Sequence, residues 1–157
     1  MIHNFNPDII LNVGTAGGIE EKNCKIGDIF LSTGNIFYHD RFLPELYNNY
    51  SYGGFPCYEI KNCAIFKKGI VSSSASTVIT KKSWDILRLK KVSVVDMEAA
   101  AIAEISSFYE IKMSAVKVIT DIVDLPGACE SQFIKNFKPC MEKLSSAFPD
   151  ILNHIIQ

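Results

Sequence analysis

Short apolar runs alternate with amphipathic stretches along this 157-residue chain, and the alternation predicts strands and helices in turn. Strands are predicted at residues 8–13, 27–33, 35–39, 68–72, 92–95 and 116–119. Helices are predicted at residues 78–89, 97–109 and 132–156, the last interrupted near Pro139 and Pro149 because proline lacks the helical N–H. This order predicts one α/β domain, residues 1–157, with a mostly parallel or mixed sheet.

Two segments show neither the pattern of a strand nor that of a helix. Residues 14–18, Gly-Thr-Ala-Gly-Gly, are expected to form a tight loop whose backbone amides and Thr15 hydroxyl can approach a ligand. Their spacing matches neither the dinucleotide fingerprint nor the phosphate-binding loop with its lysine, so a plain turn is the alternative. Residues 40–56, rich in tyrosine, asparagine, proline and glycine, are predicted to be a long loop.

Acidic residues follow two of the predicted apolar strands. Asp96 is predicted to cap the helix at 97–109, which places Glu98 in its first turn, while Asp121 ends the last predicted strand. Open α/β sheets bind ligands beyond the carboxyl ends of their strands, so Glu98 and Asp121 are expected to face one crevice. The alternatives are an ordinary first-turn carboxylate and a turn or cap residue, as is expected of Asp124.

Composition excludes several classes of partner. The net charge of −1 gives no case for nucleic acid or an anionic membrane, and no apolar run approaches the length of a membrane span. The first residues lack the basic and apolar blocks of a signal peptide. Five scattered cysteines without a C-x-x-C pair suit reduced thiols in the cytoplasm, and three dispersed histidines predict no metal.

Five segments carry a resemblance to a known family. They are Pro-Asp-Ile-Ile-Leu-Asn-Val-Gly-Thr-Ala-Gly-Gly (7–18), Ile-Gly-Asp-Ile (26–29), Tyr-His-Asp (38–40), Val-Asp-Met-Glu-Ala-Ala-Ala (95–101) and Ile-Thr-Asp-Ile-Val-Asp (119–124). In this order they resemble the nucleoside phosphorylase/hydrolase superfamily, most closely the 5′-methylthioadenosine/S-adenosylhomocysteine nucleosidases. The resemblance implies a three-layer αβα fold with a mixed central sheet, a cytoplasmic homodimer acting in methionine salvage, and no cofactor.

The resemblance also implies a reaction. It is the hydrolysis of the N-glycosidic bond of 5′-methylthioadenosine, and of S-adenosylhomocysteine as a further substrate, releasing adenine and the thioribose. Phosphorylases of the superfamily carry an arginine just before the glycine segment, whereas this chain has Asn12-Val13, which favours water as the nucleophile. The alternatives are a non-catalytic nucleoside-binding or storage-type relative and another purine N-ribosyl hydrolase or phosphorylase, including AMP and futalosine hydrolases.

Matched residue by residue, the resemblance implies a catalytic pair and its neighbours. Asp121 would protonate or hydrogen-bond adenine N7, which requires a raised pKa or a shared proton. Glu98 would accept hydrogen bonds from the ribose hydroxyls and, with Thr15, lie near the attacking water. Met97 would pack under the ribose, with a place in the core as the alternative. Thr120 would orient Asp121.

Further substrate contacts are implied at both ends of the nucleoside. Ser76 and Thr77 would contact adenine through their backbone. Tyr50 and Pro56 match the 5′-alkylthio pocket, which the family builds partly across its dimer interface. Lys117 stands where many relatives have arginine, with a solvated position on the exposed side of its strand as the alternative.

The main departure from the family is at the front of the chain. Relatives begin with about a quarter more chain, a strand and helix that include a glutamate thought to activate the water. A truncated gene, a second polypeptide that supplies the piece and a domain without catalysis are the three interpretations. A sheet without that strand is expected to expose backbone and apolar surface, which argues against a stable monomer.

Overall fold

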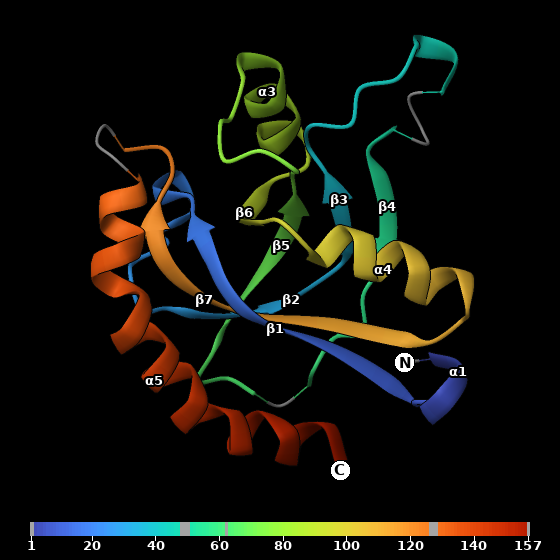
Figure 1. Ribbon diagram of the computed structural model, residues 1–157, viewed down its shortest axis with the longest axis vertical. Helices are drawn as coiled ribbons and strands as arrows, with labels where there is room; N and C mark the ends of the chain where they lie inside the picture. Colours follow the sequence, from blue (N-terminus) through green and yellow to red (C-terminus); the bar gives the residue numbers. More distant parts are fainter. Residues whose placement is uncertain (1, 48–50, 62, 126–128, 157) are drawn as a thin grey trace.

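The computed structural model describes residues 2–47, 51–61, 63–125 and 129–156, and it shows a mixed sheet with helices packed around it (Figure 1). The strands are β1 (Ile9–Gly18), β2 (Ile29–Ser32), β3 (Asn35–Tyr38), β4 (Gly53–Pro56), β5 (Lys67–Ser73), β6 (Val92–Asp96) and β7 (Lys112–Ile122). The helices are α1 (Ile2–Phe5), α3 (Lys81–Leu89), α4 (Ala99–Phe108) and α5 (Cys129–Ile156), with 3-10 turns at Glu20–Lys22 and Glu45–Tyr47.

The seven strands follow the order β2-β7-β1-β6-β5-β3-β4, and a further β2–β5 pairing closes five of them into a ring. Parallel and antiparallel pairs both occur, which confirms the prediction of a mixed sheet. β1 pairs with β7 along its whole length but meets β6 only at Gly17 and Gly18. On that second side, residues 9–16 form no strand pair with any described part of the chain.

Helices cover opposite faces of the sheet because alternate residues of a strand point to opposite sides. One face packs with α5, in a cluster that includes Ile29, Leu31, Val116, Val118, Cys140, Leu144 and Ile151. The other packs with α4, in a cluster that includes Phe30, Met113, Ala115, Ile119, Ala99, Ala100 and Ala103. Figure 1 shows the long strands β1 and β7 between these two helices, which is the expected three-layer arrangement.

The glycine segment at residues 14–18 is strand, and the prediction of a loop there is wrong. β1 continues in register with β7 to Gly18, with one irregularity between Ala16 and Gly17. A Cβ at Gly17 would lie 2.5 Å from Val123 Cγ1, and one at Gly18 would lie 2.7 Å from Cys24 Cβ. The glycines are therefore required by close side-chain packing over the strand.

Three further boundaries differ from the prediction. β4 lies inside the predicted long loop and pairs antiparallel with β3, where pairing rather than sequence period stabilises it. α3 begins only at Lys81, because the Thr80 hydroxyl accepts the backbone N–H of Ser83 at 3.2 Å and fixes the start. β7 extends through Ile122, so Asp121 lies within a strand.

The C-terminal helix is continuous, so the predicted interruptions are wrong. α5 starts at Cys129 and keeps both Pro139 and Pro149 inside it. Its buried side chains on the sheet compensate for the missing N–H groups, and the helix curves visibly in Figure 1, as prolines cause helices to do. In the described part of the chain, no helix combines the length and apolar content of a bilayer span.

Candidate active site

A cavity of about 580 Å³ opens where the carboxyl ends of several strands meet. The ends of β1, β6 and β7, the residues just after β3 and β5, and the first turn of α5 contribute to its lining. Strand ends at one edge of a sheet are the usual ligand position in α/β folds. The described lining therefore draws on segments that are more than a hundred residues apart in the sequence.

The structure brings together seven of the residues singled out in the sequence. All of them line the cavity: Thr15, Ser76, Thr77, Met97, Glu98, Thr120 and Asp121. Pro56 lies at the exposed end of β4 and is not part of this lining. Tyr50 falls outside the described residues. Met97 is exposed to the cavity rather than buried in the core.

Asp121 is a half-buried carboxyl group at the end of β7. Burial raises the pKa of Asp121, while the hydrogen bond from the Thr120 hydroxyl opposes that shift. Thr120 Oγ1 donates to Asp121 Oδ1 at 2.8 Å, so Thr120 orients the group. A carboxyl group whose pKa is raised is suited to hold a proton and to deliver it to a bound ligand.

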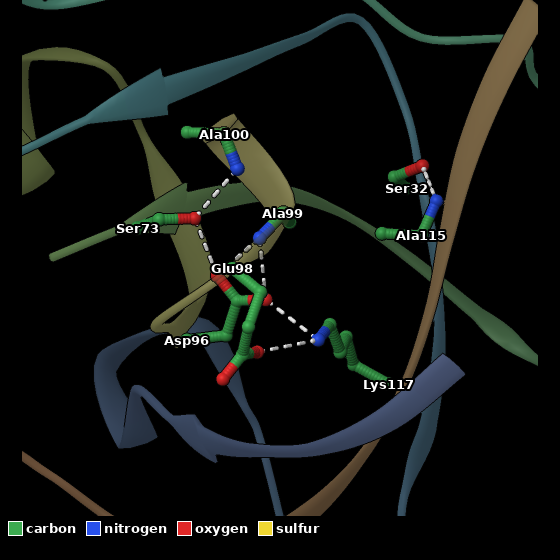
Figure 2. A network of polar contacts seen from close by, with 8 residues as sticks. All are labelled: Ser32, Ser73, Asp96, Glu98, Ala99, Ala100, Ala115 and Lys117. Atoms are coloured by element: carbon green, nitrogen blue, oxygen red, sulfur yellow. Dashed lines mark hydrogen bonds and ion pairs between the residues drawn. The ribbon is translucent and has the colours of Figure 1, made fainter. Parts of the chain in front are cut away.

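On the same strand as Asp121, the buried cation Lys117 connects two further carboxylates (Figure 2). Lys117 Nζ lies 2.6 Å from Asp96 Oδ2 and 3.4 Å from Glu98 Oε2. The side chains of Lys117 and Asp96 are 1% exposed, whereas that of Glu98 is 58% exposed. The alternative of a solvated Lys117 is therefore wrong, because the side chain lies on the α4 face of β7, beneath that helix.

The N-terminus of α4 is capped from the sheet. Glu98, rather than Asp96, occupies the N-cap position, and its side chain makes no cap bond. Asp96 still accepts the Ala99 N–H at 3.1 Å. Ser73 Oγ accepts the Ala100 N–H at 2.8 Å and donates to Asp96 Oδ1 at 2.5 Å. Because these strand residues satisfy the helix amides, the Glu98 carboxylate is free to face the cavity.

His39 is a cavity residue that the sequence analysis missed. The side chain is 2% exposed, and its Nδ1 lies 3.0 Å from Ser72 Oγ. Ser72 Oγ donates its one proton to the Phe37 carbonyl, so the imidazole donates through Nδ1, which leaves Nε2 as an acceptor. Burial lowers the pKa of His39, which favours the neutral ring over the protonated one. The Tyr-His-Asp motif after a predicted strand was the available signal.

The charges around the cavity are mainly negative. Four acidic residues line it, namely Asp96, Glu98, Asp121 and Glu130, and its described lining includes no lysine or arginine. The described residues hold no cluster of three or more His, Cys, Asp or Glu side chains placed to bind a metal.

A mixed sheet with a ligand-sized cavity at its strand ends is typical of α/β enzymes that bind small molecules. Residues 1–157 match the Phosphorylase superfamily, and the chain belongs to it. The chain is 28% identical over 158 residues to the 5′-methylthioadenosine nucleosidase of Arabidopsis thaliana, covering 98% of this chain and 59% of the relative. It is 27% identical over 155 residues to a 5′-methylthioadenosine/S-adenosylhomocysteine nucleosidase of the same plant, covering 96% and 61%.

A solved structure agrees with this placement. The apo structure of 5′-methylthioadenosine nucleosidase from Arabidopsis thaliana has a TM-score of 0.92 and 27% identity, covering 98% of this chain and 64% of that one. The chain thus spans about three fifths of the length of the curated relatives it matches.

Proposed function

We propose that this chain carries the base-releasing half of a purine nucleosidase site, which hydrolyses the N-glycosidic bond of 5′-methylthioadenosine. One observation carries the proposal: the Asp121 carboxyl, whose pKa is raised by burial, shares one cavity with Glu98 and Met97. The names of the Arabidopsis relatives support the substrate. S-adenosylhomocysteine is the further substrate we propose, since one of these relatives is named for both nucleosides.

The proposed reaction gives each of these groups one role. The bond between the ribose C1′ and the adenine N9 breaks, and protonated Asp121 donates its proton to N7, so the base leaves as neutral adenine. A water oxygen bonds to C1′ and loses one proton to a neighbouring carboxylate. Glu98 accepts hydrogen bonds from the ribose hydroxyls, and Lys117 holds its carboxylate in place from below. Met97 packs its thioether against the sugar.

The charges support hydrolysis rather than phosphorolysis. A phosphate nucleophile requires a cation to bind it, and the described lining of the cavity provides neither lysine nor arginine. The charge of Lys117 is already paired with Asp96 at 2.6 Å. Adenine release is therefore expected to proceed without phosphate and to stay unchanged when phosphate is added.

We further propose a cytoplasmic homodimer acting in methionine salvage. α4 and the segment at 42–47 expose apolar side chains, among them Phe108 and Leu46, that suit a protein interface. Pro56 lies away from the cavity of its own chain, which is consistent with a role across such an interface. The five free cysteines fit a reducing compartment.

The test is adenine release from 5′-methylthioadenosine by the purified chain, compared with Asp121→Asn. Asparagine keeps the shape of the side chain but cannot donate a carboxyl proton, so turnover should fall by about 10²-fold or more. Full turnover in Asp121→Asn would show that the acid is placed wrongly. A wild-type chain that binds adenine but does not cleave 5′-methylthioadenosine would favour the nucleoside-binding alternative. A wild-type chain that neither binds adenine nor cleaves the nucleoside would overturn the proposal.

A further inference from the structure

One wall of the cavity is irregular backbone. Ser76 and Thr77, between β5 and α3, line the cavity but belong to neither a strand nor a helix. Segments of this kind are mobile unless specific hydrogen bonds hold them. The Ser74 N–H donates to the Asp96 carbonyl at 3.0 Å, which attaches only the first residue of the segment to β6. The rest of the wall depends on other contacts.

Asp40 supplies these contacts from outside the cavity. Its Oδ2 accepts the Ala75 N–H at 2.7 Å and lies 2.9 Å from Ser74 Oγ, which also accepts the Ser76 N–H at 3.0 Å. Asp40 does not itself line the cavity, and Ser74 is buried. The carboxylate oxygen thus contacts Ser74 and Ala75 directly. It reaches Ser76 only through the Ser74 hydroxyl, which accepts the Ser76 N–H and lies 2.8 Å from the Ser76 carbonyl oxygen.

We propose that Asp40 is a positioning residue for the nucleobase: it fixes residues 74–77 in the conformation that binds the base before the ligand arrives. The proposal rests on the proposed function, since it takes a purine as the ligand. A wall that is already ordered loses less conformational freedom on binding, and this raises affinity without any direct contact. Removing the carboxylate should weaken binding while the sheet remains folded.

Two substitutions of Asp40 separate the role of its Oδ2 atom from that of its charge. Both described contacts of the carboxylate go to Oδ2, so Asp40→Asn can present its carbonyl oxygen at that place, whereas Asp40→Ala cannot. The Asp40→Asn variant also removes the negative charge that acts on neighbouring His39, so it separates anchoring from electrostatics. Glu59 is the matched control, because its carboxylate accepts the Thr33 hydroxyl and the Gly34 N–H in a loop away from the cavity.

The experiment measures adenine affinity by calorimetry and amide hydrogen exchange at Ala75 and Ser76 in the 157-residue chain. Asp40→Ala is expected to weaken adenine binding about tenfold or more, the scale of a buried donor left without its acceptor, and to speed exchange at both amides. Asp40→Asn should bind within about threefold of the wild type, and Glu59→Ala should match it.

Two results would overturn the proposal. One is wild-type affinity and exchange in Asp40→Ala, and the other is an Asp40→Asn variant as weak as Asp40→Ala, which would assign the effect to charge. A loss of affinity that merely follows a lower Tm would appear in Glu59→Ala as well. If the wild-type chain does not bind adenine, the proposed function fails instead, and hydrogen exchange still decides whether Asp40 orders residues 74–77.

Discussion

At the residue scale, the burial of Asp121 lowers the stability of the folded protein when the carboxyl group is ionised. Its folded-state pKa is raised, so the folded protein binds this proton more tightly than the unfolded chain does. The stabilising contribution is present at acid pH and is lost as the pH rises through the folded pKa. The ionised form of the carboxyl group therefore lies in a half-buried place that disfavours it, and the protonated form is favoured.

Asp121→Asn is accordingly expected to raise the melting temperature at pH 7 while it removes turnover. The gain should shrink as the pH falls and a growing share of the wild-type carboxyl takes up its proton. Thermal unfolding at several pH values measures both trends. Asp124→Asn serves as the control, because Asp124 accepts the N–H groups of Glu20 and Glu21 and should lose stability when changed. A lower melting temperature for Asp121→Asn at pH 7 would contradict this account.

His39 should show the opposite dependence on pH. Its folded pKa is lowered by burial, so the unfolded chain takes up the proton first and stability falls as the pH drops below about 6.5. His39→Asn keeps a side-chain N–H for Ser72 and should flatten the decline between about pH 7 and pH 5. The measurement is urea unfolding across that range, with exposed His3→Asn as the control. An unchanged slope in His39→Asn would refute the assignment.

Which of these residues could be foreseen depends on what a one-dimensional pattern contains. Glu98 and Asp121 were predictable because each follows an apolar run, and strand ends gather at one edge of a sheet. The burial of Lys117 was not, because it depends on α4 folding back over its face of β7. The tautomer of His39 depends on Ser72, which lies in a strand thirty-three residues away.

At the element scale, the Lys117–Asp96 pair joins β7 to the β6–α4 junction. Lys117→Met leaves the Asp96 carboxylate buried without its partner, which is expected to cost about 3–5 kcal/mol of unfolding free energy. The double variant Lys117→Met with Asp96→Asn should recover part of this loss, since no charge then remains unpaired. Urea unfolding of the two single variants and the double variant completes the cycle.

A surface pair provides the comparison. Lys67 lies 2.6 Å from Asp28, but its side chain is well exposed, so Lys67→Met should cost no more than about 1 kcal/mol. Equal losses for the buried and exposed pairs would show that burial does not set the strength of the first. A further loss of adenine release in the double variant, beyond its loss of stability, would be expected because Glu98 loses its contact with Lys117.

Elements were foreseeable where local pattern and tertiary packing agree. The apolar runs marked most strands, yet the chain pattern placed a loop at residues 14–18, where pairing with β7 imposes an extended backbone on glycines. The interruptions predicted at the two prolines of α5 are wrong for the same reason. Burial of Leu144 and Ile151 on the sheet stabilises the helix despite the N–H groups that the prolines lack. Tertiary contacts decided both cases.

At the scale of the whole molecule, two surfaces are suited to association. Residues 9–16 of β1 have no strand on one side among the described residues, and Val13 near the middle is 38% exposed. An unpaired edge of this kind accepts strands from other chains. α4 offers the second surface through Phe108, which is 80% exposed. The two surfaces predict two different kinds of assembly.

We expect the chain to sediment above its monomer mass of 17.5 kDa, and two substitutions should separate the causes. Val13→Lys places a charge on the open edge and should remove concentration-dependent larger species, because a lysine opposes edge-to-edge pairing. Phe108→Lys should reduce the defined dimer and leave the larger species. Sedimentation velocity over a range of concentrations distinguishes these outcomes. A wild-type chain that stays monomeric throughout would show that neither surface associates, and the cavity would then receive no residue from a second copy of the chain.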